Sequence, residues 1–134
     1  MAAVEISAVE NCEQTPEVYN EKLLALKDAI DLLSGKWKFC MLLNLYNYGP
    51  MRFKDLQETA QGITPKVLSK ELQELEDNLL ITRTVNNTKP VTVSYALTQH
   101  AIEIRPVLDA LIAFGLKHRT KIKENYLVQT EATA

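Results

Sequence analysis

The central segment of the chain reads Gly62-Ile63-Thr64-Pro65-Lys66-Val67-Leu68-Ser69-Lys70-Glu71-Leu72-Gln73-Glu74-Leu75, and it predicts an amphipathic helix with a sharply defined start. A threonine side chain caps a helix by accepting a hydrogen bond from a free backbone N–H, and proline suits the first turn because it has no N–H to satisfy. Thr64 and Pro65 therefore fix where this helix begins.

The spacing of the apolar residues divides this helix into two faces. Leu68, Leu72, Leu75 and Leu79 recur at helical spacing and are expected to face a core. The other face carries Thr64, Lys66, Ser69, Lys70 and Gln73. Such residues suit a helix inserted N-terminus first into a DNA major groove, since lysine reaches phosphate or guanine, glutamine reads adenine, and the helix dipole favours phosphate. A solvated surface helix shows the same pattern. The neighbouring segments must therefore decide between a DNA-binding helix and an ordinary surface helix.

The neighbouring segments predict a winged helix-turn-helix, a mainly α fold with a small β-hairpin. A short strand at 51–53 and a brief helix that ends at Gln61-Gly62 precede the recognition helix, which spans about 64–78. After Leu80 the period becomes twofold, so that a hairpin, the wing, is expected over about 81–97. Its tip carries Asn87 and Lys89, which can reach the DNA backbone or the minor groove.

Further helices are expected on both sides of this unit. Thr15-Pro16 begins one that ends at Ser34-Gly35, and an almost wholly apolar helix that starts at Lys36 belongs in the middle of the fold. A last helical region runs from Thr98 to about residue 123, and Pro106 is expected to kink or divide it. The domain would then span 15–123, between a flexible arm, 1–14, and a flexible tail, 124–134.

The first and last helices carry more apolar surface than one side of a small domain needs. We expect a twofold homodimer built from these N- and C-terminal helices. The alternative, that both faces cover the core of their own domain, agrees equally well with the pattern. The residues expected at the dimer interface are Leu23, Leu26, Ile30, Val107, Leu111 and Phe114.

Composition sets the class of protein. With 134 residues and 46% hydrophobic content, the chain suits one globular domain. No apolar run approaches the roughly 20 residues that span a bilayer, and the first residues lack a secretion signal, so no membrane partner and a cytoplasmic location are expected. Cys12 and Cys40 have no CxxC partner, and neither a metal nor a cofactor is predicted.

Charge argues against nucleic acid, because the net charge is −2 and the isoelectric point is about 5.7. The distribution of charge weakens this objection. The acidic residues Glu71, Glu74, Glu76 and Asp77 crowd the later part of the recognition helix, whereas Lys66 and Lys70 lie near its start. Further cations flank the helix in sequence, namely Arg52, Lys54, Arg83 and Lys89.

Six segments in this order resemble the HxlR-type branch of the MarR-like winged-helix transcriptional regulators, over roughly residues 28–117. They are Asp31-Leu32-Leu33-Ser34-Gly35-Lys36-Trp37, Gly49-Pro50-Met51-Arg52-Phe53-Lys54-Asp55-Leu56, Gly62-Ile63-Thr64-Pro65-Lys66-Val67-Leu68-Ser69, Leu72-Gln73-Glu74-Leu75-Glu76, Tyr95-Ala96-Leu97-Thr98 and Pro106-Val107-Leu108-Asp109-Ala110-Leu111. The resemblance implies a homodimeric bacterial regulator, with a repressor preferred here, whose two recognition helices enter successive major grooves about 34 Å apart.

The chain departs from this family pattern at two places. Members often carry a cysteine shortly before the GKW segment, some of them as an oxidant sensor, and here that position falls near Leu24. Cys12 lies upstream in the arm and Cys40 in the central helix, where a thiol is usually inert, so redox sensing by either is not favoured. Glu71 and Gln73 stand where relatives commonly place arginines; Glu71 either faces a cytosine amino group or lies aside.

The sequence thus predicts a regulator that binds double-stranded DNA, and no enzyme, since His100 and His118 have no catalytic constellation around them. The predicted DNA-binding residues are Arg52, Lys54, Thr64, Pro65, Lys66, Ser69, Lys70, Gln73, Arg83, Asn87 and Lys89. An unidentified small-molecule effector beside Trp37, Tyr46 and Phe114 stays open, although these aromatics more often only fill a core. The alternative function is a winged-helix protein-interaction module without DNA binding, which the acidic balance and Glu71 favour.

Overall fold

The computed structural model describes residues 15–133, which fall into two units that meet between Gly35 and Lys36. The described part of the first unit is one helix, α2 (Pro16–Leu33). Thr15 caps it as predicted, because its hydroxyl oxygen accepts a hydrogen bond from the Val18 N–H at 3.2 Å. The chain leaves the helix through Gly35, whose φ of 112° lies in the left-handed region that glycine tolerates. The predicted arm 1–14, with Cys12, lies outside the described residues.

The central helix of the second unit is α3 (Lys38–Tyr48). It begins two positions later than predicted, since Lys36 and Trp37 form a bend. Met41, Leu42 and Leu45 are buried in the core, as the apolar sequence of this helix indicates. Lys38 is buried too, which the sequence analysis did not anticipate.

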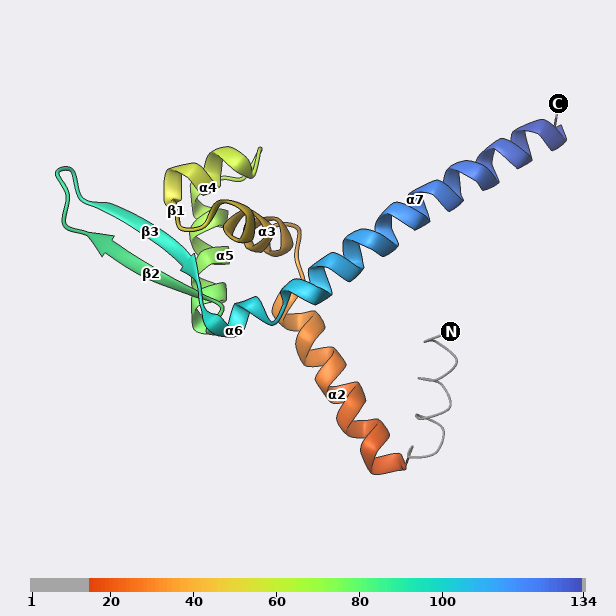
Figure 1. Cartoon of the computed structure of the whole chain (residues 1–134), viewed down its shortest axis with the longest axis horizontal. Coiled ribbons are helices and arrows are strands. Elements are labelled where there is room, and N and C mark those ends of the chain that lie inside the picture. The colour runs from red at the N-terminus through yellow and green to blue at the C-terminus, as the bar shows by residue number, and fades with distance from the viewer. Residues whose placement is uncertain (1–14, 134) are drawn as a thin grey trace. The chain divides into compact units, whose positions relative to one another are not determined.

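The helix-turn-helix follows directly (Figure 1). Strand β1 (Met51–Arg52) leads into α4 (Phe53–Thr59), where the Asp55 carboxylate accepts a hydrogen bond from the Arg52 N–H at 3.3 Å. A turn at Gly62, with φ of 92°, connects α4 to α5 (Pro65–Asp77), the predicted recognition helix. Thr64 caps α5, since its hydroxyl oxygen accepts from the Val67 N–H at 3.3 Å. The predicted start of α5 is confirmed.

The end of α5 corrects one prediction. Leu79 was expected in the core, but the helix stops at Asp77, and Leu79 adopts a φ of 65° and is 69% exposed. Leu80 fills the core instead and is fully buried. The backbone oxygens of Leu79 and Leu80 both accept hydrogen bonds from the Thr98 hydroxyl, at 2.6 and 3.3 Å. Thr98 therefore ties the end of α5 to the start of the next helix.

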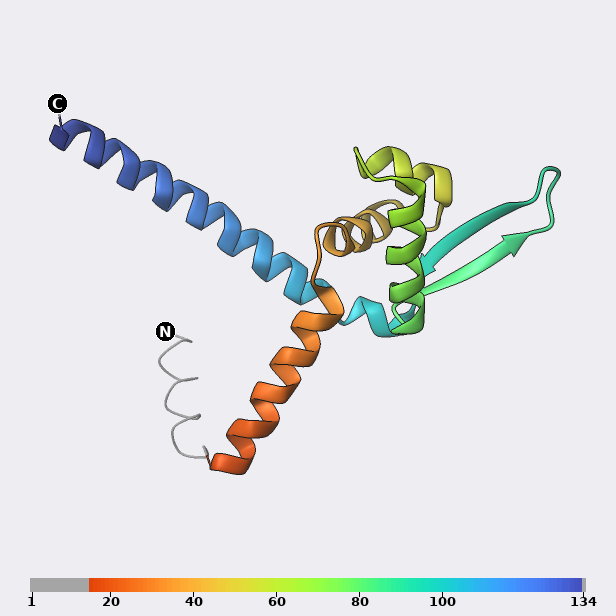
Figure 2. The same cartoon turned by 180° about the vertical axis from the view of Figure 1, so that it is seen from behind.

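The wing is a hairpin of β2 (Ile81–Asn86) and β3 (Thr92–Leu97), and it extends away from α3, α4 and α5 as a ribbon in both views (Figures 1 and 2). The antiparallel sheet has the order β1-β3-β2, with Met51 opposite Tyr95 and Arg83 opposite the same tyrosine on the other side. The sheet thus joins the short strand before α4 to the wing.

The last helical region is divided in two, as Pro106 predicts, into α6 (Gln99–Ile102) and α7 (Arg105–Thr133). The expected end near residue 123 is wrong, because α7 continues through Thr133 and the segment predicted as a tail is helical. Leu108 anchors the first part of α7 in the core.

Candidate nucleic-acid interface

The outer face of α5 is open to solvent. All five residues predicted to face outward are exposed, as is Pro65, while Leu68, Leu72 and Leu75 are buried on the opposite side. The division of the helix into two faces is therefore as its spacing predicts. The exposed residues are Thr64, Pro65, Lys66, Ser69, Lys70 and Gln73.

Besides Thr64, which caps the helix, two of these side chains have partners on α5 itself. The Gln73 amide nitrogen donates a hydrogen bond to the Asp77 carboxylate at 2.9 Å. The Lys70 ammonium nitrogen lies 3.9 Å from Oε1 of Glu74, a loose pair on an exposed surface that costs little to separate. Both side chains are thus accessible to a ligand that approaches the outer face.

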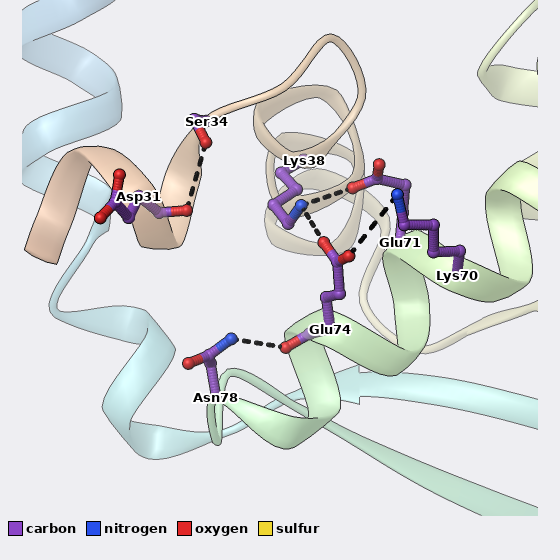
Figure 3. A network of polar contacts seen from close by, with 7 residues as sticks. All are labelled: Asp31, Ser34, Lys38, Lys70, Glu71, Glu74 and Asn78. Carbon is purple, nitrogen blue, oxygen red and sulfur yellow. Dashed lines mark hydrogen bonds and ion pairs between the residues drawn. The ribbon is translucent and has the colours of Figure 1, made fainter.

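Glu71 does not belong to this face. It is 9% exposed, and its Oε2 accepts a hydrogen bond from the ammonium nitrogen of Lys38 at 2.6 Å (Figure 3). The same nitrogen donates to Oε2 of Glu74 at 2.5 Å. Of the two readings of Glu71, the one in which it lies aside is the observed one. We call Lys38, Glu71 and Glu74 the inner ion cluster.

Two members of the inner ion cluster, Lys38 and Glu74, have pKa values shifted in favour of their charged forms. Burial opposes the charge on Lys38, but the hydrogen bonds and negative charges of Glu71 and Glu74 together outweigh it and raise the pKa of Lys38. The hydrogen bond and the charge of Lys38 lower the pKa of Glu74, with a smaller contribution from Lys70. One cation on α3 therefore engages two of the carboxylates that made α5 look acidic in sequence.

Sequence reasoning missed Lys38, although two signals were present. The lysine lies within an almost wholly apolar helix, and Glu71 falls at helical spacing between Leu68 and Leu75 on the inner face of α5. A buried charge needs an opposite charge nearby. A lysine and a glutamate that both fall at buried helix positions are therefore expected to form an ion pair with each other.

The surface between α5 and the wing is hollowed. A concave region of about 470 Å³ is lined by residues of α5 and of both wing strands, together with the first residue of α4. It brings together three predicted site residues, Ser69, Gln73 and Arg83. The other residues that line it are Phe53, Glu76, Val93 and Tyr95.

The remaining predicted contacts lie outside this hollow but are exposed. Arg52 and Lys54 stand where β1 meets α4, and Asn87 and Lys89 lie in the link at the wing tip. The interface that the sequence predicts is therefore accessible at every position, although its parts come from separate elements.

The residues predicted for a dimer interface are also exposed. Leu23, Leu26 and Ile30 form an uncovered stripe on α2, and on α7 Val107, Leu111 and Phe114 are uncovered, the last 67% exposed. Within the second unit, Leu111 borders a shallow apolar groove of about 290 Å³ between α3 and α7, which Cys40 also lines. Cys40 is half-buried. The other residues of this groove are Phe39, Leu43, Leu108 and Ile112.

Among the histidines and aromatic residues that drew attention in sequence, His118, Phe114 and Tyr46 make local contacts. His100 is exposed on α6, and His118 on α7 stacks on Phe114 with ring centroids 5.9 Å apart. The Tyr46 hydroxyl donates to the Ala101 backbone oxygen. Among residues 15–133, no cluster of histidine, cysteine and acidic side chains fits a metal ion, and none of the helices described there is long and apolar enough to cross a membrane.

A capped helix with an exposed basic start, presented by a helix-turn-helix and flanked by a β-ribbon, defines a winged-helix DNA-binding protein. Comparison with known proteins agrees, because residues 32–123 match the family described as HxlR-like helix-turn-helix. The chain belongs to the HxlR family and is a DNA-binding transcriptional regulator.

Individual relatives support the same assignment. An HTH-type transcriptional regulator of Halalkalibacterium halodurans is 34% identical over 111 residues, which cover 83% of this chain and 90% of that protein. The crystal structure of a MarR-family transcriptional regulator from Enterococcus faecalis V583 superposes with a TM-score of 0.67 and 30% identity, covering 75% of this chain and 90% of that one. The redox regulator HypR in its reduced form gives a TM-score of 0.69 at 25% identity, covering 75% of this chain and 98% of that one.

Proposed function

We propose that this regulator is a homodimeric repressor, which inserts the N-terminal part of α5 into the major groove of its operator and lays the wing beside it. The observation that carries the proposal is the outer face of α5, where Lys66 and Lys70 are exposed while Glu71 is turned inward to Lys38. A face of this composition attracts phosphate and offers donors to base edges.

Each part of the interface has a proposed role. Lys66 and Lys70 contact phosphates or guanine, and the Thr64 and Ser69 hydroxyls contact either backbone or base. Gln73 reads adenine after its amide gives up the hydrogen bond to Asp77. Arg83 faces the hollow beside Ser69, where it is placed to meet a phosphate that passes between α5 and the wing. Arg52 and Lys54, with Asn87 and Lys89 at the tip, extend the contacts to the neighbouring backbone or the minor groove.

The homodimer is proposed from the exposed apolar residues on α2 and α7. Apolar side chains that remain uncovered in a monomer commonly mark an interface. Pairing two copies through these helices gives each operator two recognition helices, which must lie about 34 Å apart to enter successive major grooves. Occupied operators exclude other proteins from the same DNA, which is why we propose repression.

The protein-interaction module remains the competing function, and its support has narrowed. The acidic isoelectric point still favours the interaction module. The second observation in its favour, an acidic Glu71 on the outer face of α5, no longer holds, because Glu71 is buried. The proposal includes no catalytic step and places the protein in the cytoplasm, where bacterial chromosomal DNA lies.

Fluorescence anisotropy with DNA from the region upstream of the gene tests the proposal. The double variant Lys66→Ala/Lys70→Ala should bind much more weakly, and wild-type binding should weaken as salt rises. The matched control is Lys117→Ala/Lys121→Ala on α7, which removes the same charge at the same spacing from another exposed helix. Absence of binding, or equal losses in both double variants, would favour the interaction module.

A further inference from the structure

The inner ion cluster is connected to the outer face of α5 through one residue. Glu74 has two carboxylate oxygens, of which Oε2 lies 2.5 Å from Lys38 and Oε1 lies 3.9 Å from Lys70 (Figure 3). Its side chain is 40% exposed, whereas that of Lys38 is 8% exposed. Glu74 thus stands between a buried cation and a cation that is proposed to bind DNA.

The two contacts of Glu74 differ in strength. A short hydrogen bond between charged groups at low exposure is strong, whereas an exposed pair near 4 Å is weak. Lys38 therefore decides where the carboxylate of Glu74 lies. Without Lys38, the ion pair with Lys70 is the one that this carboxylate keeps among residues 15–133, and it would close on Lys70 and compete with a phosphate for the same ammonium group.

We propose that Lys38 is a positioning residue for DNA binding: by holding Glu71 and Glu74 on the inner side of α5, it keeps Lys70 available for a phosphate of the operator. The inference rests on the proposed function of α5. It assigns a DNA-binding role to a buried lysine on another helix, one that touches no DNA.

The test is whether the contribution of Lys70 to DNA binding depends on Lys38. The background variant is Lys38→Met/Glu71→Leu, which removes both buried charges together, because a buried pair replaced by apolar residues is often tolerated whereas a lone buried carboxylate is not. It leaves Glu74 without its inner partner. Circular dichroism verifies folding, and anisotropy measures affinity for one operator fragment at several salt concentrations.

Three comparisons give the expected pattern. In the wild type, Lys70→Ala weakens binding several-fold and lowers the slope of log affinity against log salt by about 1. In Lys38→Met/Glu71→Leu, Lys70→Ala changes affinity by less than about twofold, the scatter of independent sites. Adding Glu74→Gln to that background restores the full effect of Lys70→Ala. The charge-matched control Lys36→Met, which removes a neighbouring exposed lysine, leaves the effect of Lys70→Ala unchanged.

A purely structural role for Lys38 would give a different result. Lys70→Ala would then weaken binding by the same factor in every folded background, and this outcome would overturn the inference. If Lys38→Met/Glu71→Leu does not fold, Lys38→Gln/Glu71→Gln replaces it as the background, because two uncharged side chains that can hydrogen-bond to each other leave no lone buried charge. In this background too, Lys70→Ala should change affinity by less than about twofold, and adding Glu74→Gln should restore its full effect. An undiminished effect of Lys70→Ala in this background overturns the inference.

Failure of the proposed function looks different from failure of this inference. If the wild type binds no DNA, the proposed function fails first. If the wild type binds and Lys66→Ala weakens binding, but Lys70 and Lys38 act independently, only the positioning role is refuted.

Discussion

The ammonium nitrogen of Lys38 lies 2.6 Å from Oε2 of Glu71, and both residues are at most 9% exposed. This pair joins the central helix α3 to the recognition helix α5 across the core of the helix-turn-helix. It also turns toward the core a carboxylate that would otherwise repel DNA. The ion pair between Lys38 and Glu71 thus contributes both to the packing of α3 against α5 and to the charge of the outer face of α5.

Breaking this pair from one side should destabilise the fold strongly. Lys38→Met leaves Glu71 as an uncompensated buried charge, and we expect the free energy of unfolding to fall by about 3 to 5 kcal/mol. Urea denaturation measures this, with the exposed Lys36→Met as a control that should change it by no more than about 0.5 kcal/mol. A similar small change for both variants would show that the inner ion cluster contributes little to stability.

The same cluster makes stability depend on pH at both extremes. The pKa of Glu74 is lowered in the fold, so its stabilisation is complete above the ordinary glutamate value of about 4.3 and is lost as pH falls through the lowered pKa. The pKa of Lys38 is raised, so its stabilisation is complete below about 10.4 and is lost as pH rises through the raised pKa. Denaturation at a series of pH values should show both losses, and Glu74→Gln should reduce the acid loss. An identical acid profile in Glu74→Gln would contradict the assignment.

Contacts to phosphate and to bases should separate in mutagenesis. Lys66→Ala is expected to weaken binding to all sequences alike and to lower the salt slope by about 1, as loss of a phosphate contact does. Gln73→Ala is expected to relax preference at one base pair, by about 1 to 3 kcal/mol of discrimination. Binding to a panel of single-base operator variants distinguishes the two. Gln73 is not a base-reading residue if its loss weakens binding to every sequence equally.

Removal of the cap of α5 should cost stability at the start of the recognition helix. Thr64→Ala leaves the Val67 N–H without its hydroxyl acceptor, and we expect a loss of about 1 kcal/mol in the free energy of unfolding. Thr64→Ser keeps an oxygen in the same place and should stay close to the wild type. Equal losses in the two variants would mean that the hydroxyl is not what stabilises this end.

A charge on the exposed stripe of α7 should disrupt the proposed dimer. Leu111→Lys is expected to shift the protein toward monomer in sedimentation velocity, because a lysine would be desolvated in an apolar interface. Val85→Lys on the wing, which is also exposed, is the matched control and should leave the assembly unchanged. A wild type that sediments as a monomer at all concentrations would refute the dimer itself.

The sequence was sufficient where local chemistry decides. Thr64 and Pro65 predicted the start of α5, Pro106 predicted the division between α6 and α7, and the change to a twofold period predicted the wing. These features follow from caps, backbone restrictions and side-chain periodicity, which act over a few residues.

The errors arose where distant residues decide. Leu79 continued the helical spacing, but the backbone turns at that residue and delivers Leu80 to the core. The helix beyond residue 123 has no strong apolar period, so its continuation to Thr133 was not visible in the pattern. The sequence left both readings of Glu71 open, because its partner Lys38 lies far away in sequence. The roles assigned to the exposed residues of the interface remain predictions.

The junction from Asn78 to Leu80, pinned through Thr98, also sets which side of the ribbon looks toward α5. Side chains on a strand alternate between its two surfaces, so one residue inserted or deleted at this joint would present Thr82 or Thr84 to the hollow and turn Arg83 to the opposite surface. The length of this joint therefore fixes which residues of the wing face the recognition helix. Changes in operator preference can arise by substitution on either element, whereas a change in length at their joint would uncouple them.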